Sequence, residues 1–231
     1  NLPKVRFAKD SDYVEAANAL FDEATRAALK GFSRPAISVS GGYDSQAVAA
    51  TACKVMGPDA RVLGLTSVPE AGWDGRVADH RFGDESAHVA ALAAMYPTLE
   101  TQSVDAAGLS FDHKLEAVFL MAGAPPRNAM NLHWIHELHT QAKSSGCDVL
   151  LTGAMGNATF SFDGHGTLPS LLKSGRWVQL LREARAAAKA QKIGTARALV
   201  SGAVMPHLPD WLFDPVMRWR HGKTPDTQLE W

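Results

Sequence analysis

Residues 35–58 have the sequence PAISVSGGYDSQAVAATACKVMGP, and this stretch indicates the fold more clearly than any other in the chain. The run 36–39 is short, apolar and partly β-branched, which is typical of a buried parallel strand. Residues 44–56 are rich in alanine and are followed by Gly57 and Pro58, which end helices. The pattern therefore predicts a strand, a glycine turn and a helix in direct succession.

The turn in this unit is Ser40-Gly41-Gly42-Tyr43-Asp44-Ser45. Its two glycines allow positive φ angles and a close approach of the backbone to a ligand, and the helix that follows offers free N–H groups and a positive dipole end to an anion. Its two serines add hydroxyl donors. Asp44 is suited to holding a Mg²⁺ ion that bridges phosphate oxygens. The turn therefore predicts a site for a nucleoside triphosphate with its metal.

Strands and helices alternate along the rest of the first two thirds of the chain. Such alternation predicts an α/β fold with a doubly wound parallel sheet and right-handed crossovers, in which ligands bind beyond the carboxyl ends of the strands. Further strands are expected at 61–66, 99–104 and 148–151, and helices at 11–30, 84–95, 114–121, 132–143, 168–190 and 196–205.

A length of 231 residues with 46% hydrophobic residues suits one domain. We divide it into a leading helix at 1–34, a nucleotide-binding core at 35–164 and a helical extension at 165–231. The chain starts at Asn1, and residues 221–231 show no periodic pattern. We therefore expect a piece cut from a longer protein, truncated in its helical extension.

The charge and cysteine content argue against several classes of partner. Lys and Arg total 23 against 24 for Asp and Glu, so we expect no basic face for nucleic acid or for an anionic membrane. No apolar run is long enough to cross a bilayer, and no signal peptide opens the chain. Cys53 and Cys147 have no metal-binding spacing and suit a reducing compartment. We expect a cytoplasmic protein with two free thiols.

The turn at 40–45 matches neither the GxxxxGK[ST] loop nor the GxGxxG fingerprint. It resembles the SGGxDS pyrophosphate loop of the family that contains asparagine synthetases, β-lactam synthetases, GMP and NAD synthetases and lasso-peptide cyclases. The resemblance implies an adenine nucleotide α-hydrolase-like fold, the PP-loop ATPase type, extended by C-terminal helices. It also implies ATP and Mg²⁺ as cofactors and cleavage of ATP between the α and β phosphates.

A second segment, DVLLTGAMGNA at 148–158, resembles the strand and loop that carry an acidic Ser-Gly-Glu-Gly-x-Asp-Glu run in asparagine synthetases. The resemblance places Asn157 where the family has a second Mg²⁺-binding Asp, and it places Ala154 and Ala158 where the family has Glu. If the fourth strand lies beside the first, the two loops face each other across ATP. The lost carboxylates indicate a divergent branch, related to asparagine synthase or similar to lasso-peptide cyclases.

The resemblance, which covers roughly 35–164, assigns roles to individual residues. Asp44 and Asn157 are the implied catalytic and metal-binding residues. The implied nucleotide-binding residues are Val39, Ser40, Gly41, Gly42, Asp44, Ser45, Leu65, Thr66, Thr152 and Gly153. Of these, Val39, Leu65 and Thr66 are expected to line the adenine. The late lysine of the family has no identifiable counterpart, and Lys173 and Lys223 are poor matches.

The implied reaction is ATP-dependent formation of an amide. A small-molecule or peptide carboxylate is adenylated, and ammonia or an amine then displaces AMP. An N-terminal glutaminase-like domain is expected in the parent protein. Two alternatives stay open: an ATP-binding module without ligase chemistry, and a peptide macrolactam (lasso) cyclase. A tRNA-modifying enzyme with the same loop is disfavoured, because the chain has no basic face and no cysteine pairs.

Three other features have ordinary structural explanations. His133, His136 and His139 are spaced by three, whereas the histidines of HExxH stand four apart, so we expect a helix surface rather than a metal site. Arg127 could bind a substrate carboxylate but is expected on the surface. The stretch Trp211-Leu212-Phe213, with Met217 and Trp219, could form a partner surface, but we expect it to pack on the core or on a missing domain.

Overall fold

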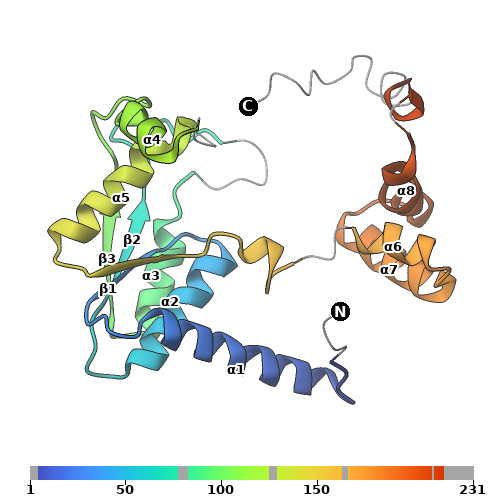
Figure 1. The fold of residues 1–231 in the computed structure, drawn as a ribbon, viewed down its shortest axis with the longest axis horizontal. Coiled ribbons are helices and arrows are strands. Elements are labelled where there is room, and N and C mark those ends of the chain that lie inside the picture. Colours follow the sequence, from blue (N-terminus) through green and yellow to red (C-terminus); the bar gives the residue numbers. More distant parts are fainter. Residues whose placement is uncertain (1–4, 78–82, 125–128, 163–165, 210, 216–231) are drawn as a thin grey trace. The chain divides into compact units, whose positions relative to one another are not determined.

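The computed structural model in Figure 1 describes residues 5–77, 83–124, 129–162, 166–209 and 211–215. Contacts divide the chain into two compact units, Asn1–Ser161 and Phe162–Trp231. The second unit begins close to residue 165, where the sequence predicts the start of a helical extension. Of the residues singled out above, Arg127, Met217, Trp219 and Lys223 lie outside the described part of the chain.

The first unit is built on four parallel strands in the order β3-β2-β1-β4 (Figure 1). The strands are β1 (Pro35–Ser38), β2 (Val62–Ser67), β3 (Leu99–Val104) and β4 (Val149–Thr152). Because β1 pairs with both β2 and β4, the strand order reverses beside it. The structure confirms the predicted parallel sheet, and it shows that the fourth strand lies beside the first.

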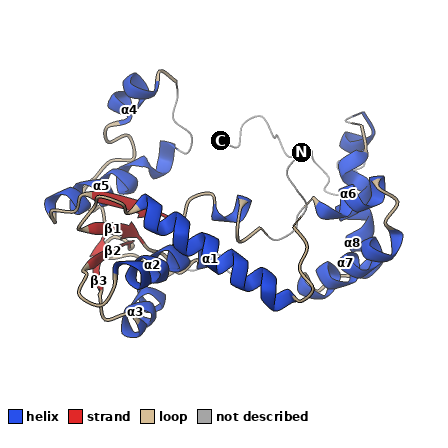
Figure 2. Ribbon diagram, turned by 60° about the horizontal axis from the view of Figure 1, so that its bottom comes forward, coloured by secondary structure: helices blue, strands red, loops and turns tan. Residues whose placement is uncertain are grey.

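Helices cover both faces of this sheet. The helices of this unit are α1 (Asp10–Ala28), α2 (Tyr43–Met56), α3 (Ser86–Met95), α4 (Leu115–Ala122) and α5 (Leu132–Ser144). Successive strand residues point to opposite faces. Ile37 accordingly packs with residues of α2 and α3, whereas its neighbour Ala36 packs with Leu138 and Ala142 of α5. Figure 2 shows α5 and α3 on opposite sides of the strands.

The second unit differs from its prediction in one respect. The single helix expected at 168–190 is two helices, α6 (Thr167–Lys173) and α7 (Trp177–Ala190). The chain turns at Gly175, which has a φ angle of 66°, a conformation that side chains with a Cβ rarely adopt. The helix expected at 196–205 begins as α8 (Thr195–Leu199) and continues through a π-helical turn, Val200–Val204. Leu171, Leu180 and Ala203 form the core of this unit.

Asp148 fixes the point at which β1 and β4 begin to pair. Its carboxylate accepts hydrogen bonds from the backbone N–H groups of Ser33, at 2.7 Å, and Arg34, at 3.1 Å. These bonds favour the ionised form, and the Ser33 N–H is the largest cause that lowers the pKa of the Asp148 carboxyl below its ordinary value. The side chain therefore ties the chain before β1 to the start of β4.

We expect Asp148→Asn to lower the urea midpoint of unfolding at pH 7, because an amide accepts these N–H groups less strongly than a carboxylate. The pKa of Asp148 is depressed in the folded state, so its contribution is present above the unfolded pKa of about 3.9 and is lost as pH falls through the folded pKa. Urea unfolding of the wild type and of Asp148→Asn at about pH 7 and pH 3 measures how the contribution of Asp148 to stability changes with pH. An equal difference in midpoint at both pH values would contradict the assignment.

Candidate functional site

The turn between β1 and α2 is closed by its own serines. The Ser40 N–H donates to Ser45 Oγ at 2.9 Å, and the two hydroxyl oxygens lie 2.8 Å apart. Ser45 Oγ also donates to the Gly42 carbonyl at 3.1 Å, and the Gly42 N–H donates to Ser40 Oγ at 3.2 Å. The serine hydroxyls, which the sequence predicts as donors to a ligand, therefore bind the turn to itself and hold its shape.

The backbone of the same turn is open to an anion. Helix α2 begins at Tyr43, with Gly42 as its N-cap residue, so its first N–H groups have no acceptor within the helix. No side chain caps them. The N-terminus of a 14-residue helix also carries a partial positive charge. This end of α2 can therefore bind phosphate oxygens through the backbone alone.

The loop after β4 lies directly against this turn. A Cβ atom added to Gly153 would lie 2.5 Å from Ser45 N and 2.8 Å from Ser45 Cα. A Cβ added to Gly156 would lie 2.2 Å from Asp44 Cγ. Only glycine allows such approaches, because real Cβ atoms do not come this close to other heavy atoms. The two loops predicted to face each other are therefore in contact.

Asp44 and Asn157 are the residues expected to hold Mg²⁺. The Oδ1 atom of Asp44 is buried and has no hydrogen-bond partner among the described residues. The Oδ1 atom of Asn157 accepts a hydrogen bond from Ser161 Oγ at 3.2 Å and keeps a second lone pair. Mg²⁺ commonly takes one or two protein carboxylates and fills its other positions with phosphate and water. A buried, unpaired carboxylate oxygen and an amide oxygen that line the same pocket fit that ion when it arrives with a triphosphate.

These groups open into a pocket of about 860 Å³, a size typical of small-molecule sites. Seven of the ten residues expected to bind nucleotide line it, together with Asn157. The seven are Val39, Ser40, Gly42, Asp44, Ser45, Thr152 and Gly153.

Gly41, Leu65 and Thr66 are the expected nucleotide-binding residues that do not line the pocket. Gly41 is covered by the side chain of Glu85. Leu65 is fully buried on the face under α5, and Thr66 is buried in β2. Ser67, the last residue of β2, lies in the pocket wall in their place.

The structure adds wall residues that the sequence did not indicate. Trp134, Ile135 and Leu138 come from the start of α5, and Glu85 comes from the residue before α3. A helix is predicted at 132–143, but the spacing of its apolar residues does not show where its first turn lies relative to the sheet. The sequence therefore does not place these residues in the pocket. The α5 residues supply apolar lining in addition to Val39, and Glu85 supplies a carboxylate.

No Lys or Arg side chain is among the described residues that line this pocket. Lys173, one of the two lysines considered for the late position of the family, lies in the second unit. Within the described lining, the groups that can balance the charge of a bound triphosphate are therefore backbone N–H groups, the His139 side chain and a bound metal ion.

The three histidines of α5 form no metal site within the described part of the chain, where no group of three His, Cys, Asp or Glu residues could hold a metal ion. Burial is the largest cause that lowers the pKa of His136, and the nearby positive charge of Lys114 lowers it further. Cys53 and Cys147 are both free, and burial raises the pKa of each thiol. Of the three histidines, His139 lines the large pocket.

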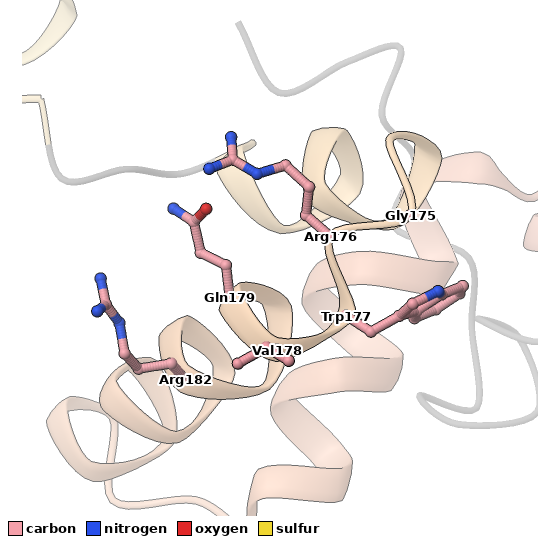
Figure 3. A pocket seen from close by; sticks show the side chains of 6 residues that line it. All are labelled: Gly175, Arg176, Trp177, Val178, Gln179 and Arg182. Carbon is pink, nitrogen blue, oxygen red and sulfur yellow. The ribbon is translucent and has the colours of Figure 1, made fainter.

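A second hollow, of about 640 Å³, lies at the start of α7 in the second unit. Figure 3 shows the side chains of Arg176, Gln179 and Arg182 extending toward the same side of α7, with Trp177 pointing away from them. The Arg182 side chain is 78% exposed and pairs with its neighbour Glu183. This hollow contains none of the residues of the two loops, so the chemistry of the turn belongs to the larger pocket.

The family model for asparagine synthase matches residues 16–226 of this chain. Comparison with curated proteins gives no match.

Two NAD synthetases represent the solved structures that match. The NH3-dependent NAD synthetase from Campylobacter jejuni, in complex with the nitrate ion, is 13% identical with a TM-score of 0.39; the match covers 64% of this chain and 60% of that one. The chain thus spans about 60% of the length of the Campylobacter protein. The NAD+ synthetase from Burkholderia pseudomallei is 17% identical with a TM-score of 0.35, and the match covers 94% and 93% of the two chains.

We expect Gly153→Ala to lower the free energy of unfolding by about 1–3 kcal/mol, because the new methyl group would overlap the backbone of Ser45. Ala158→Ser is a matched control, since it also adds one heavy atom to the same loop but at an exposed position, and it should change the value by about 0.5 kcal/mol or less. Urea unfolding compares the two. Equal stability of both variants would show that the loops are not in contact.

Proposed function

This chain belongs to the asparagine synthase family, whose domains are of an ATP-utilising ligase type, and from this membership we propose that it adenylates a substrate carboxylate. The observation that carries the proposal is the contact between Gly153 and Ser45. That contact brings the loop after β4 onto the N-terminus of α2. Asp44 and Asn157 consequently line the same pocket as the free backbone N–H groups.

In the proposed complex the turn at 40–45 holds the pyrophosphate part of ATP through the N-terminus of α2. Asp44 and Asn157 would hold Mg²⁺, which supplies positive charge for the leaving pyrophosphate. The apolar wall made by Val39, Trp134 and Leu138 suits the adenine ring, whose flat faces pack well on such side chains.

The proposed chemistry has two steps. A carboxylate oxygen of the acid attacks the α-phosphorus of ATP, the bond to the bridging oxygen breaks, and pyrophosphate leaves. The nitrogen of ammonia or an amine then attacks the acyl carbon, AMP leaves, and the nitrogen loses a proton. The protein contributes mainly by placing the reactants and by stabilising the charge that develops on the phosphates.

The acid and the amine differ from those of asparagine formation in our proposal, because Ala154, Asn157 and Ala158 carry no negative charge. A small-molecule or peptide carboxylate is the proposed substrate, and closure of a peptide ring is one form that the reaction could take. We propose a glutaminase-like partner domain in the parent protein as the source of ammonia where ammonia is the nucleophile.

The compartment is also part of the proposal. No helix in the described part of the chain combines the length and the apolar character that a membrane span requires. Free thiols at Cys53 and Cys147 suit a reducing environment. We therefore propose that the reaction takes place in the cytoplasm.

A second candidate function is binding of ATP without ligase chemistry. It is favoured by the pocket lining, in which the described residues include no Lys or Arg to stabilise the transition state. The two functions differ in the fate of the nucleotide, because a binding module leaves the α-phosphate intact.

The deciding measurement is exchange of labelled pyrophosphate into ATP by the full-length parent protein, over a panel of amino acids and peptides. We expect exchange with at least one acid and none without Mg²⁺. Exchange with no acid, in a protein that binds ATP, would overturn the ligase proposal in favour of the binding module.

Asp44→Asn should weaken binding of ATP in the presence of Mg²⁺ by at least about 10-fold, since loss of even an indirect metal partner commonly costs that much. Binding of ATP without metal should stay unchanged or become tighter, because the carboxylate repels the phosphates. Asp59→Asn, an exposed carboxylate just after the other end of α2, is the control and should match the wild type. Titration calorimetry with and without Mg²⁺ gives both affinities, and equal losses in the two variants would count against a metal role for Asp44.

A further inference from the structure

The side chain of Glu85 lies against the turn at 40–45. A Cβ atom added to Gly41 would lie 3.3 Å from Glu85 Oε1 and 3.4 Å from Glu85 Cδ. Because Gly41 has no side chain, it leaves room for this carboxylate. Gly41 itself does not line the pocket. Glu85 itself lines the pocket together with Asp44 and Asn157. A carboxylate from the residue before α3 thus lies against the phosphate turn.

The local structure does not use the charge of Glu85. Glu85 is the N-cap residue of α3 but makes no capping hydrogen bond through its side chain. The start of α3 is held instead by the preceding residue, Asp84, because its Oδ1 accepts the Ser86 N–H at 2.9 Å. In the described part of the chain, the Glu85 carboxylate has neither a hydrogen bond nor an ion pair with another residue. Among the described residues, therefore, nothing competes with a ligand or with solvent for this carboxylate.

The charges in the pocket indicate what that partner is. Asp44 and Glu85 are the carboxylates among the described lining residues, and no Lys or Arg lies beside them. A triphosphate would be repelled by both carboxylates, because like charges at short range repel. A divalent cation between the phosphates and the carboxylates removes this conflict. Mg²⁺ binds in this way, with one or two carboxylates and oxygen atoms of the phosphates.

We propose that Glu85 supplies the second carboxylate of the Mg²⁺ site and so replaces the acidic residues that are missing at Ala154, Asn157 and Ala158. This inference rests on the proposed function, because it requires that the pocket bind ATP. Asn157 then serves as a neutral oxygen ligand, and Asp44 and Glu85 provide the charge. The second negative charge of the site thus comes from the residue before α3 rather than from the β4 loop.

The test compares Glu85→Gln with Asp84→Asn in the full-length protein. The two residues are adjacent carboxylates at the start of one helix, but Asp84 does not line this pocket. Mn²⁺ is the probe, because its electron paramagnetic resonance signal reports the free ion, and it is titrated at a fixed concentration of ATP. We expect Glu85→Gln to weaken Mn²⁺ binding about 10-fold and Asp84→Asn to change it less than twofold. Circular dichroism checks that both variants fold.

ATP binding without metal gives a second readout. Removal of a repelling carboxylate should leave this affinity unchanged or raise it. In Glu85→Gln, therefore, only the affinity for ATP in the presence of metal should fall. Restoration of Mn²⁺ affinity by Asn157→Asp in the Glu85→Gln background would further support the inference, because it would show that a carboxylate at position 157 can replace the one at position 85. Unchanged or tighter Mn²⁺ binding in Glu85→Gln overturns the inference. A wild type that binds no ATP in either condition overturns the proposed function itself, which separates the two failures.

Discussion

The structure depends on one backbone contact, that of Gly153 with the peptide of Asp44 and Ser45. The contact is possible because β1 and β4 are neighbours in register, with Ser38 beside Thr152, so that their following loops leave the sheet at the same level. At the other end of the strand pair, Asp148 holds the chain before β1 by accepting the N–H groups of Ser33 and Arg34. The pair is thus fixed at both ends, and the phosphate turn, Asp44 and Asn157 take their positions from it.

Much of this fold was predictable, because its decisive signals are local. The apolar run before Ser40 and the glycines after it define β1 and the turn, and β3 has the bounds that its pattern predicts. The break between α6 and α7 was missed for a physical reason. Apolar residues continue with helical spacing across Gly175, and the two helices are separated by the positive φ angle of that residue and the non-helical ψ angle of Arg176. A single glycine within a helical pattern does not predict a positive φ angle, because helices tolerate glycine at a cost of about 1 kcal/mol.

Pocket residues that come directly after the strands could be predicted from the sequence. Pocket residues that the helices bring into place could not. Thr152, Gly153 and Asn157 reach the pocket because the carboxyl ends of parallel strands meet at one edge. Leu65 and Thr66 were placed too early in β2, since the strand runs on to Ser67 before its residues leave the sheet. Trp134 and Glu85 reach the pocket through the packing of α5 and α3 on the sheet. That packing joins residues far apart in sequence, so no local pattern reveals it.

The hydrogen bonds between Ser40 and Ser45 have a consequence for the entropy of ligand binding. A glycine-rich turn is ordinarily a mobile element, and a ligand that orders it loses affinity to the lost freedom of the chain. Here Ser45 is buried, and its hydroxyl is joined to both ends of the turn. The anion-binding shape therefore exists before any anion arrives. Pre-organisation of this kind lets the backbone N–H groups of the turn bind an anion without the lysine or arginine that such a ligand would need elsewhere.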